Sequence, residues 1–208
     1  MDFHSDRCFL TGEKTNARSR GISVFPEWIL ERYNLHDQTL TMLGDNRVKY
    51  RDLKLPVSVQ AFDACERLEK SIRQAFTNGY DAVRDLPELL LFQWMAKLMY
   101  GVLYHDFAYA LESHKEKGKS FKLSPLMQDK LTKLHLLLQS VLVPMEFNGF
   151  VPWSIQVLNV NYSKDVFNYK DETHNLNFSL GMNGFGIVAC LQDMGENNVF
   201  HQDIISKI

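Results

Sequence analysis

The segment Leu86–His114 constrains the fold more than any other stretch of this chain, because it is long and apolar on most of its circumference. Taken as residues 87–116, it predicts one helix about 45 Å long, at 1.5 Å per residue. Pro87 suits a first helical turn, and Gly118 is a natural end. A helix with so little polar surface has to be surrounded by the rest of the domain.

Two further helices are expected on either side of this segment. Residues 57–78 carry apolar side chains at helical spacing, which predicts a helix closed by Gly79. Five charged side chains of this helix are assigned to its exposed side: Glu66, Arg67, Glu69, Lys70 and Arg73. Ser124 and Pro125 begin a later helix that is expected to run to about Val143.

Strand periodicity begins after Asn148-Gly149. Asn183-Gly184 between two apolar runs predicts a hairpin. Residues 185–191 are nearly all apolar, which predicts a central strand covered on both faces. The expected class is therefore α+β, with a helical portion around the long helix packed on a C-terminal antiparallel sheet. A small N-terminal segment, 1–56, and a core, 57–208, are expected to form one compact unit.

Composition and charge exclude several classes of protein. A net charge of −2 over 208 residues gives no global attraction to nucleic acid or to an anionic membrane. Four polar residues interrupt the long helix before it reaches the ~20 residues that span a bilayer: Gln93, Lys97, His105 and Asp106. Cys8, Cys65 and Cys190 form no paired motif, and the first residues lack a signal peptide's apolar run. We expect a cytoplasmic protein without membrane contact.

Two N-terminal runs, Cys8-Phe-Leu-Thr-Gly12 and Ile22-Ser-Val-Phe-Pro-Glu-Trp-Ile-Leu30, follow each other across a short polar spacer. They resemble the opening of HNH-type treble-clef proteins of bacteria and phages, which reads C-x-x-C-G, a spacer, and then E-H-x-x-P-x-W-L. The matching residues are Cys8, Gly12, Pro26, Trp28 and Leu30. The resemblance covers about residues 1–35 and implies a small treble-clef-like appendage.

In that family, knuckle cysteines and later Cys or His residues hold zinc, and the histidine before the proline is the general base of a nuclease. Here Thr11 stands where the second cysteine would be, and Ser23-Val24 where the acidic residue and the histidine would be. The resemblance therefore implies loss of both metal and nuclease activity. His4 and Cys8 offer only half of a replacement zinc site, so we expect no cofactor.

Four polar residues of the long helix fall on one narrow stripe: Gln93, Lys97, Tyr100 and Tyr104. One interpretation is a polar slot that faces a ligand, with Lys97 binding an anion. The other is the wet edge of a buried helix, on which Lys97 snorkels to solvent and the tyrosine hydroxyls are exposed.

The main basic cluster follows the long helix and comprises Lys115, Lys117, Lys119 and Lys122, with Lys130 and Lys133 further on. Such a patch binds phosphate, and Phe121 is placed to stack on a base. A solvated loop between helices explains the same residues without a ligand. Two acidic groups near histidines, His105-Asp106 and the run Asp171, Glu172, His174, are further candidates, although no nucleophile is tied to them.

The leading hypothesis is a non-catalytic binding protein of bacterial or phage type, whose partner is a protein or a nucleic acid. One alternative is an enzyme, either a divergent metal-dependent nuclease or another hydrolase. The other is a self-assembling structural protein, in which a sheet edge pairs with a second copy to form a homodimer.

Overall fold

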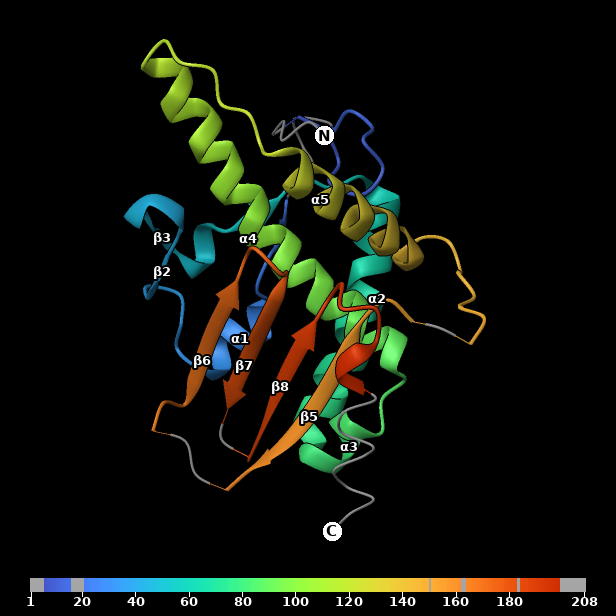
Figure 1. The fold of residues 1–208 in the computed structure, drawn as a ribbon. Helices are drawn as coiled ribbons and strands as arrows, with labels where there is room; N and C mark the ends of the chain where they lie inside the picture. Colours follow the sequence, from blue (N-terminus) through green and yellow to red (C-terminus); the bar gives the residue numbers. More distant parts are fainter. Residues whose placement is uncertain (1–5, 16–20, 150, 162–163, 183, 199–208) are drawn as a thin grey trace.

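A computed structural model describes residues 6–15, 21–149, 151–161, 164–182 and 184–198. It shows a layer of helices behind a four-stranded antiparallel sheet (Figure 1). The predicted α+β class, with one long helix and a C-terminal antiparallel sheet, is confirmed. None of the helices in the described part of the chain has the length and hydrophobicity needed to cross a membrane.

The central element is α4 (Glu88–Glu116), which matches the predicted helix. Every residue from Leu91 to Tyr104 is buried, so the rest of the domain surrounds this helix as expected. Gly118, with a φ of +65°, ends it, and the N–H of Lys119 donates to the carbonyl of His114 over 2.8 Å. The last turns of α4 project beyond the body of the domain (Figure 1).

Two helices contact α4 along its length, α2 (Val59–Asn78) and α5 (Pro125–Leu138). Ser124 caps α5 as predicted, accepting from the N–H of Met127 over 3.2 Å. The helix nevertheless ends before the predicted Val143 and continues only as a 3₁₀ turn, η3 (Gln139–Val141). Pro144 has no N–H to pair with the carbonyl of Ser140 in a continued helix, and this carbonyl accepts instead from the side chain of Gln93 on α4 over 2.9 Å.

The sheet contains β5 (Ser154–Val160), β6 (Phe167–Glu172), β7 (Asn177–Met182) and β8 (Gly184–Cys190), in the order β5-β8-β7-β6. β8 is central, as predicted, but the prediction that it is covered on both faces was wrong. Phe185, Ile187 and Ala189 are buried, whereas Val188, on the opposite face, is 37% exposed. In the described part of the chain the layer of helices lies on one face of the sheet (Figure 1), and Gly184 and Val188 are exposed on the other face of β8.

The first part of the chain consists of short elements. They are β1 (Ile22–Ser23), α1 (Glu27–Arg32), β2 (Thr39–Thr41), η1 (Leu43–Asp45), β3 (Arg47–Lys49), η2 (Tyr50–Asp52) and β4 (Lys54–Leu55), and α3 (Tyr80–Arg84) follows α2. β1 pairs with β4, and β2 with β3.

This N-terminal part shares the core of the domain. Phe9, Leu10 and Phe25 are buried in the same cluster as the residues of α4. The ring of Phe25 meets that of Tyr169 on β6 edge-to-face, with centroids 5.3 Å apart. Residues 6–15 and 21–55 are therefore held in place by the helices and the sheet.

Candidate functional site

The structure divides the polar stripe of α4 into three separate environments. The Gln93 amide donates to the carbonyl and the hydroxyl oxygens of Ser140, over 2.9 and 3.1 Å. Lys97 is only 1% exposed, and its ammonium donates to the carbonyls of Ser23 and Val24 over 2.9 and 3.1 Å. The third environment, around Tyr100 and Tyr104, is a cavity.

The ammonium of Lys97 also forms a buried ion pair with Glu69 on α2. Lys97 is therefore neither an exposed anion-binding group nor a snorkelling side chain. The assignment of Glu69 to the exposed side of α2 was wrong, because this residue is only 9% exposed. The sequence spacing indicates that Glu69 lies on the buried face of α2, because it is four residues after Cys65 and three before Ile72, both of which are buried.

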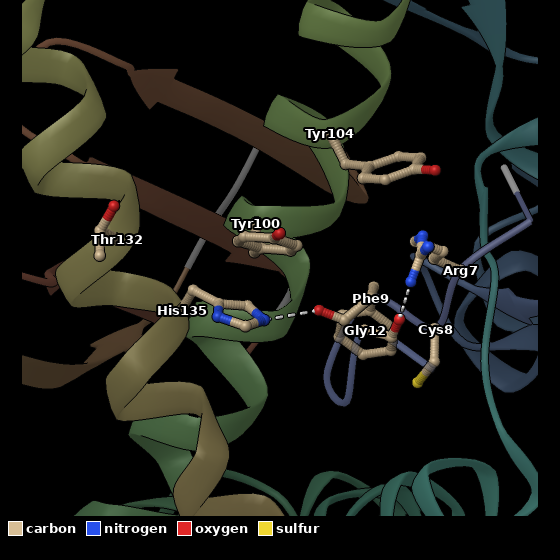
Figure 2. Close-up of a pocket in the computed structure, with 8 residues that line it drawn as sticks. All are labelled: Arg7, Cys8, Phe9, Gly12, Tyr100, Tyr104, Thr132 and His135. Carbon is tan, nitrogen blue, oxygen red and sulfur yellow. Dashed lines mark hydrogen bonds between the residues drawn. The ribbon is translucent and has the colours of Figure 1, made fainter. Parts of the chain in front are cut away.

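Residues 7–14 form a short N-terminal hairpin, closed by an antiparallel bridge between Arg7 and Lys14. Tyr100 and Tyr104 line a cavity of about 380 Å³ between this hairpin, α4 and α5 (Figure 2). Its volume falls within the range of small-molecule sites. The lining residues are Arg7, Cys8, Phe9, Gly12, Tyr100, Tyr104, Thr132 and His135. Three segments far apart in the sequence thus form one concave surface.

The hairpin wall is fixed by its own hydrogen bonds. The N–H of Cys8 donates to the carbonyl of Glu13 over 2.8 Å, and the N–H of Gly12 donates to the carbonyl of Cys8 over 2.9 Å. Gly12 has a φ of +69°, a conformation that favours glycine. The guanidinium of Arg7 donates to the Gly12 carbonyl over 2.9 Å, which places a permanent positive charge at the wall of the cavity.

The α5 wall is joined directly to the hairpin. His135 Nε2 donates to the carbonyl of Phe9 over 2.8 Å, and the Gln139 amide donates to the carbonyl of Leu10 over 2.7 Å. Burial lowers the pKa of His135, although its hydrogen bond to Phe9 acts in the opposite direction. The imidazole is therefore neutral at pH 7, with its proton on Nε2.

The α4 wall presents two phenols. The ring centroid of Tyr100 lies 5.6 Å from that of His135 and 6.0 Å from that of Phe9. Burial raises the pKa of Tyr104 to about 12, with a contribution from the charge of Asp6. Burial also raises the pKa of Tyr100 well above its usual value. Both hydroxyls are therefore protonated at neutral pH and act as hydrogen-bond donors.

This combination of groups favours a ligand with negatively charged or acceptor atoms. Arg7 supplies a cation, Tyr100 and Tyr104 supply O–H donors, and the aromatic rings supply an apolar wall. The thiol of Cys8 points away from the tyrosines and His135 in Figure 2. It is therefore not placed as a nucleophile towards a molecule in the cavity.

The sequence analysis named Tyr100 and Tyr104 as ligand-binding candidates and Cys8 only as a metal ligand, and it did not name Arg7, Phe9, Gly12, Thr132 or His135 as members of a site. No local pattern identifies them, because His135 and its acceptor Phe9 are 126 residues apart. The predicted metal residue His4 lies outside the described residues. Among the residues that are described, no group of three or more His, Cys, Asp or Glu side chains is placed to hold a metal ion.

The predicted basic cluster lies at the projecting end of α4 and in the loop that follows. Lys115, Lys117, Lys119 and Lys122 are all exposed. Phe121 packs against the rings of His114 and Phe107, at 5.1 and 6.5 Å, so its ring is partly covered by the protein itself. Of the two later lysines, Lys130 donates to the carbonyl of His174 over 2.6 Å, and Lys133 pairs with Asp129.

The acidic candidates stabilise local structure. Glu172 accepts from the N–H groups of His174 and Asn175, each over 3.0 Å, and so closes the β6–β7 turn. Asp106 on α4 accepts from the N–H of Leu43 over 2.7 Å. Asp171, at the end of β6, lies close enough to Asp106 for the two carboxylates to repel each other. His105 bonds to the carbonyl of Lys54 over 2.9 Å.

A second, wider cleft of about 630 Å³ separates the segment from Gly21 to Trp28 from the exposed side of α2. The charged side chains along it are Glu27, Glu66, Arg67, Glu69, Lys70 and Arg73. Because acidic and basic groups balance, this cleft gives no preference for the charge of a ligand.

Searches of models of protein families, of curated proteins and of solved structures each found no match to this chain. The case for a function therefore rests on the geometry of the cavity and its surroundings.

Proposed function

We propose that this chain is a non-catalytic binding domain whose ligand, a small organic anion, enters the cavity between the N-terminal hairpin, α4 and α5. The observation that carries the proposal is the position of Arg7. Its guanidinium is tied to Gly12 by one N–H group and stands at a cavity whose other lining residues are four ring side chains together with Cys8, Gly12 and Thr132.

The charge balance within the cavity supports an anion. A guanidinium retains its proton throughout the physiological range, and it presents several donors to a carboxylate or a phosphate. Arg7 is the only charged residue in the lining, because His135 is neutral and the tyrosines are protonated. The negative charge of Asp6, which acts on Tyr104, belongs to a residue outside the lining. The aromatic walls, in turn, favour a ligand with a planar apolar body that carries the anionic group.

The test is isothermal titration calorimetry with two ring compounds of similar size, benzoate and benzamide. The wild-type chain is expected to bind benzoate in the millimolar range and benzamide at least about tenfold more weakly, a difference of about 1.4 kcal/mol. Arg7→Gln is expected to remove the preference for benzoate, because only the charge of the ligand distinguishes the two compounds.

Arg84→Gln is the matched control, since Arg84 is exposed on α3 and pairs with Asp81 and Asp85 away from the cavity. This variant should bind both compounds as the wild type does. Equal affinity for benzoate and benzamide, or unchanged benzoate binding by Arg7→Gln, would contradict the proposal.

A second candidate function is binding of single-stranded nucleic acid, in which the projecting end of α4 contacts the phosphate backbone. The observation in its favour is that the four lysines of this end are exposed and take part in none of the ion pairs found in the described residues. Fluorescence anisotropy with a labelled oligonucleotide should then show affinity that falls steeply with salt. Changing Lys115, Lys117 and Lys119 to Gln should abolish it, and salt-insensitive binding would exclude this function.

A further inference from the structure

The wide cleft between residues 21–28 and α2 has a wall with an unused hydrogen-bond donor. Trp28 lines this cleft, and its indole N–H is buried without an acceptor among the described residues. A buried donor that lacks an acceptor costs free energy, and native proteins leave few such groups unpaired. A ligand in the cleft that carries an acceptor atom would pair with this group.

The strand β1 leaves a second donor on the same wall. In the described residues β1 pairs only with β4, and the N–H of Val24 donates to the carbonyl of Leu53 over 2.8 Å. Because hydrogen bonding alternates along an antiparallel pair, the N–H and the carbonyl of Ser23 are directed away from β4. That carbonyl accepts from Lys97, whose ammonium also pairs with Glu69 of the opposite wall. The outer edge of β1 therefore faces the cleft, with the N–H of Ser23 on it.

The α2 wall carries unpaired charges of both signs. Glu66, Glu69 and Arg73 recur at spacings of three and four, so they lie on the face of α2 that borders the cleft. Glu69 is already paired with Lys97. Glu66 and Arg73, in contrast, take part in none of the ion pairs found where the structure describes the chain. One helix face thus presents a carboxylate and a guanidinium to a ligand.

The separation of these two charges suits a short peptide. Arg73 follows Glu66 by seven residues, a rise of about 10 Å along α2. Three residues of extended chain span about the same length. Lys70 lies on the same face and adds a second cation towards Arg73, whereas Arg67 is turned by about 100° from Glu66, to the rim of the cleft. The order of charges along α2 therefore places an ammonium at Glu66 and a carboxylate at Arg73.

The remaining walls suit the body of such a peptide. Ile22 and Pro26 are buried beside the cleft, and the half-buried ring of Phe62 faces them from α2, so an apolar side chain has surfaces to cover. The backbone carbonyls of an extended peptide are acceptors for donors on the edge of a strand. Because the acidic and basic groups of the cleft balance, a ligand with one charge of each sign suits it better than an ion of either sign.

We propose that this cleft binds a short extended peptide of about three residues whose two termini are free. The ammonium lies at Glu66, the carboxylate lies at Arg73, and backbone carbonyls accept from the N–H groups of Trp28 and Ser23. The site is separate from the cavity at Arg7, so the proposal does not depend on the anion proposed for that cavity.

The experiment is a nuclear magnetic resonance titration of the ¹⁵N-labelled chain with four forms of the peptide Ala-Phe-Ala. One form has free ends, one is acetylated, one is amidated, and one carries both blocking groups. The free peptide is expected to bind saturably. Blocking either end should weaken binding about two- to fivefold, because it removes one ion pair with an exposed side chain.

The indole resonances report on the wall of the cleft in the same titration. The N–H signal of Trp28 should move as it gains an acceptor. The signal of Trp153 is the internal control and should stay in place, because this indole is also buried without an acceptor in the described residues but does not line the cleft.

Two single variants assign the ends of the peptide. Glu66→Gln should remove the effect of acetylation and keep the effect of amidation, and Arg73→Gln should do the reverse. Both side chains are exposed, so neither change is expected to disturb the fold. Arg84→Gln is the matched control, because Arg84 is exposed on α3 and does not line the cleft, and it should respond to the four peptides as the wild type does.

Three results would overturn the proposal. One is equal affinity for the free and the doubly blocked peptide. Another is a Trp28 indole signal that does not move at saturation. The third is peptide binding that is lost in Arg7→Gln and retained in Arg73→Gln, because the peptide would then occupy the cavity at Arg7.

Discussion

The ammonium nitrogen of Lys97 lies 2.9 Å from the carbonyl oxygen of Ser23, a residue 74 positions earlier in the chain. Together with its bond to Val24 and its ion pair with Glu69, this contact joins α4 to both α2 and the β1–α1 connection. Lys97, one of the predicted ligand-binding residues, therefore holds three elements together.

Replacing Lys97 by Met should destabilise the fold strongly. The methionine fills a similar volume, but it leaves the buried carboxylate of Glu69 and the carbonyls of Ser23 and Val24 without their donor. Breaking a buried ion pair from one side typically costs about 3–5 kcal/mol. Urea unfolding measures this loss directly.

Adding Glu69→Gln to Lys97→Met provides the control. Gln removes the uncompensated charge, so the double variant should be more stable than Lys97→Met alone. A Lys97→Met variant within ~1 kcal/mol of the wild type would contradict a structural role for the pair.

Gly101, one turn after Lys97, allows the close approach of α4 to the same connection. A Cβ atom at this position would lie 2.6 Å from Cγ2 of Val24, closer than two carbon atoms can approach. Gly101→Ala should therefore destabilise the protein by about 1–3 kcal/mol through overpacking, despite the higher helix propensity of alanine. Thermal unfolding measures the loss of melting temperature that Gly101→Ala causes in the wild type and in the Val24→Ala variant. The loss should be smaller in Val24→Ala, because this change removes the clashing methyl groups. Equal losses in the two proteins would contradict the contact.

Stability should also depend on the protonation of Asp106. Burial raises the pKa of this carboxyl from 3.8 to about 6, repulsion from Asp171 adds to the shift, and the hydrogen bond from Leu43 opposes it. Because the folded state binds this proton more tightly than the unfolded state, the contribution is favourable at low pH and is lost as the pH rises through about 6.

Asp106→Asn keeps an acceptor for the N–H of Leu43 and removes the charge. At pH 7 this variant should be more stable than the wild type by ~1–3 kcal/mol, and the difference should disappear near pH 4, as measured by urea unfolding across this range. Asp129→Asn, on the exposed face of α5, is the control and should show no such pH-dependent gain. If the free energies of unfolding of the wild type and of Asp106→Asn changed with pH in parallel, the raised pKa assigned to Asp106 would be contradicted.

The elements that the sequence predicts well have strong local signals. The small share of polar residues in α4 predicted that the rest of the domain surrounds this helix, and Ser124-Pro125 predicted where α5 begins. The end of α5 was misplaced because the change to a 3₁₀ turn at Gln139 has no local signal, and Pro144 indicates only the last residue that a helix could reach. The covering of β8 was misjudged because Val188 is apolar yet exposed, on the face of the strand opposite to Ile187 and Ala189.

The candidate site was predicted only in part, for the same reason. Tyr100 and Tyr104 stood out because they are polar groups within an apolar helix. Arg7 and His135 did not stand out. They reach the same cavity only because the hairpin and α5, which are far apart in the sequence, contact each other in the fold. Sequence periodicity describes which side of an element is buried, but it does not describe which distant segment covers it.

The role of the tyrosines in the cavity gives another prediction. Tyr100→Phe and Tyr104→Phe keep the rings and remove one O–H donor each, so each should weaken benzoate binding about two- to tenfold with little change in stability. Separate calorimetric titrations of the wild type and of each variant with benzoate measure the change in affinity. Unchanged binding in the double variant Tyr100→Phe/Tyr104→Phe would show that the anion does not reach these hydroxyls.

The most direct test of the central claim is a nuclear magnetic resonance titration of the ¹⁵N-labelled chain with benzoate. The account predicts saturable shifts confined to the cavity, at the amides of residues 7–12 and the neighbouring turns of α4 and α5, and the same shifts should be absent in Arg7→Gln. Shifts that do not saturate, or that cluster at the lysine-rich end of α4 instead of the cavity, would contradict it.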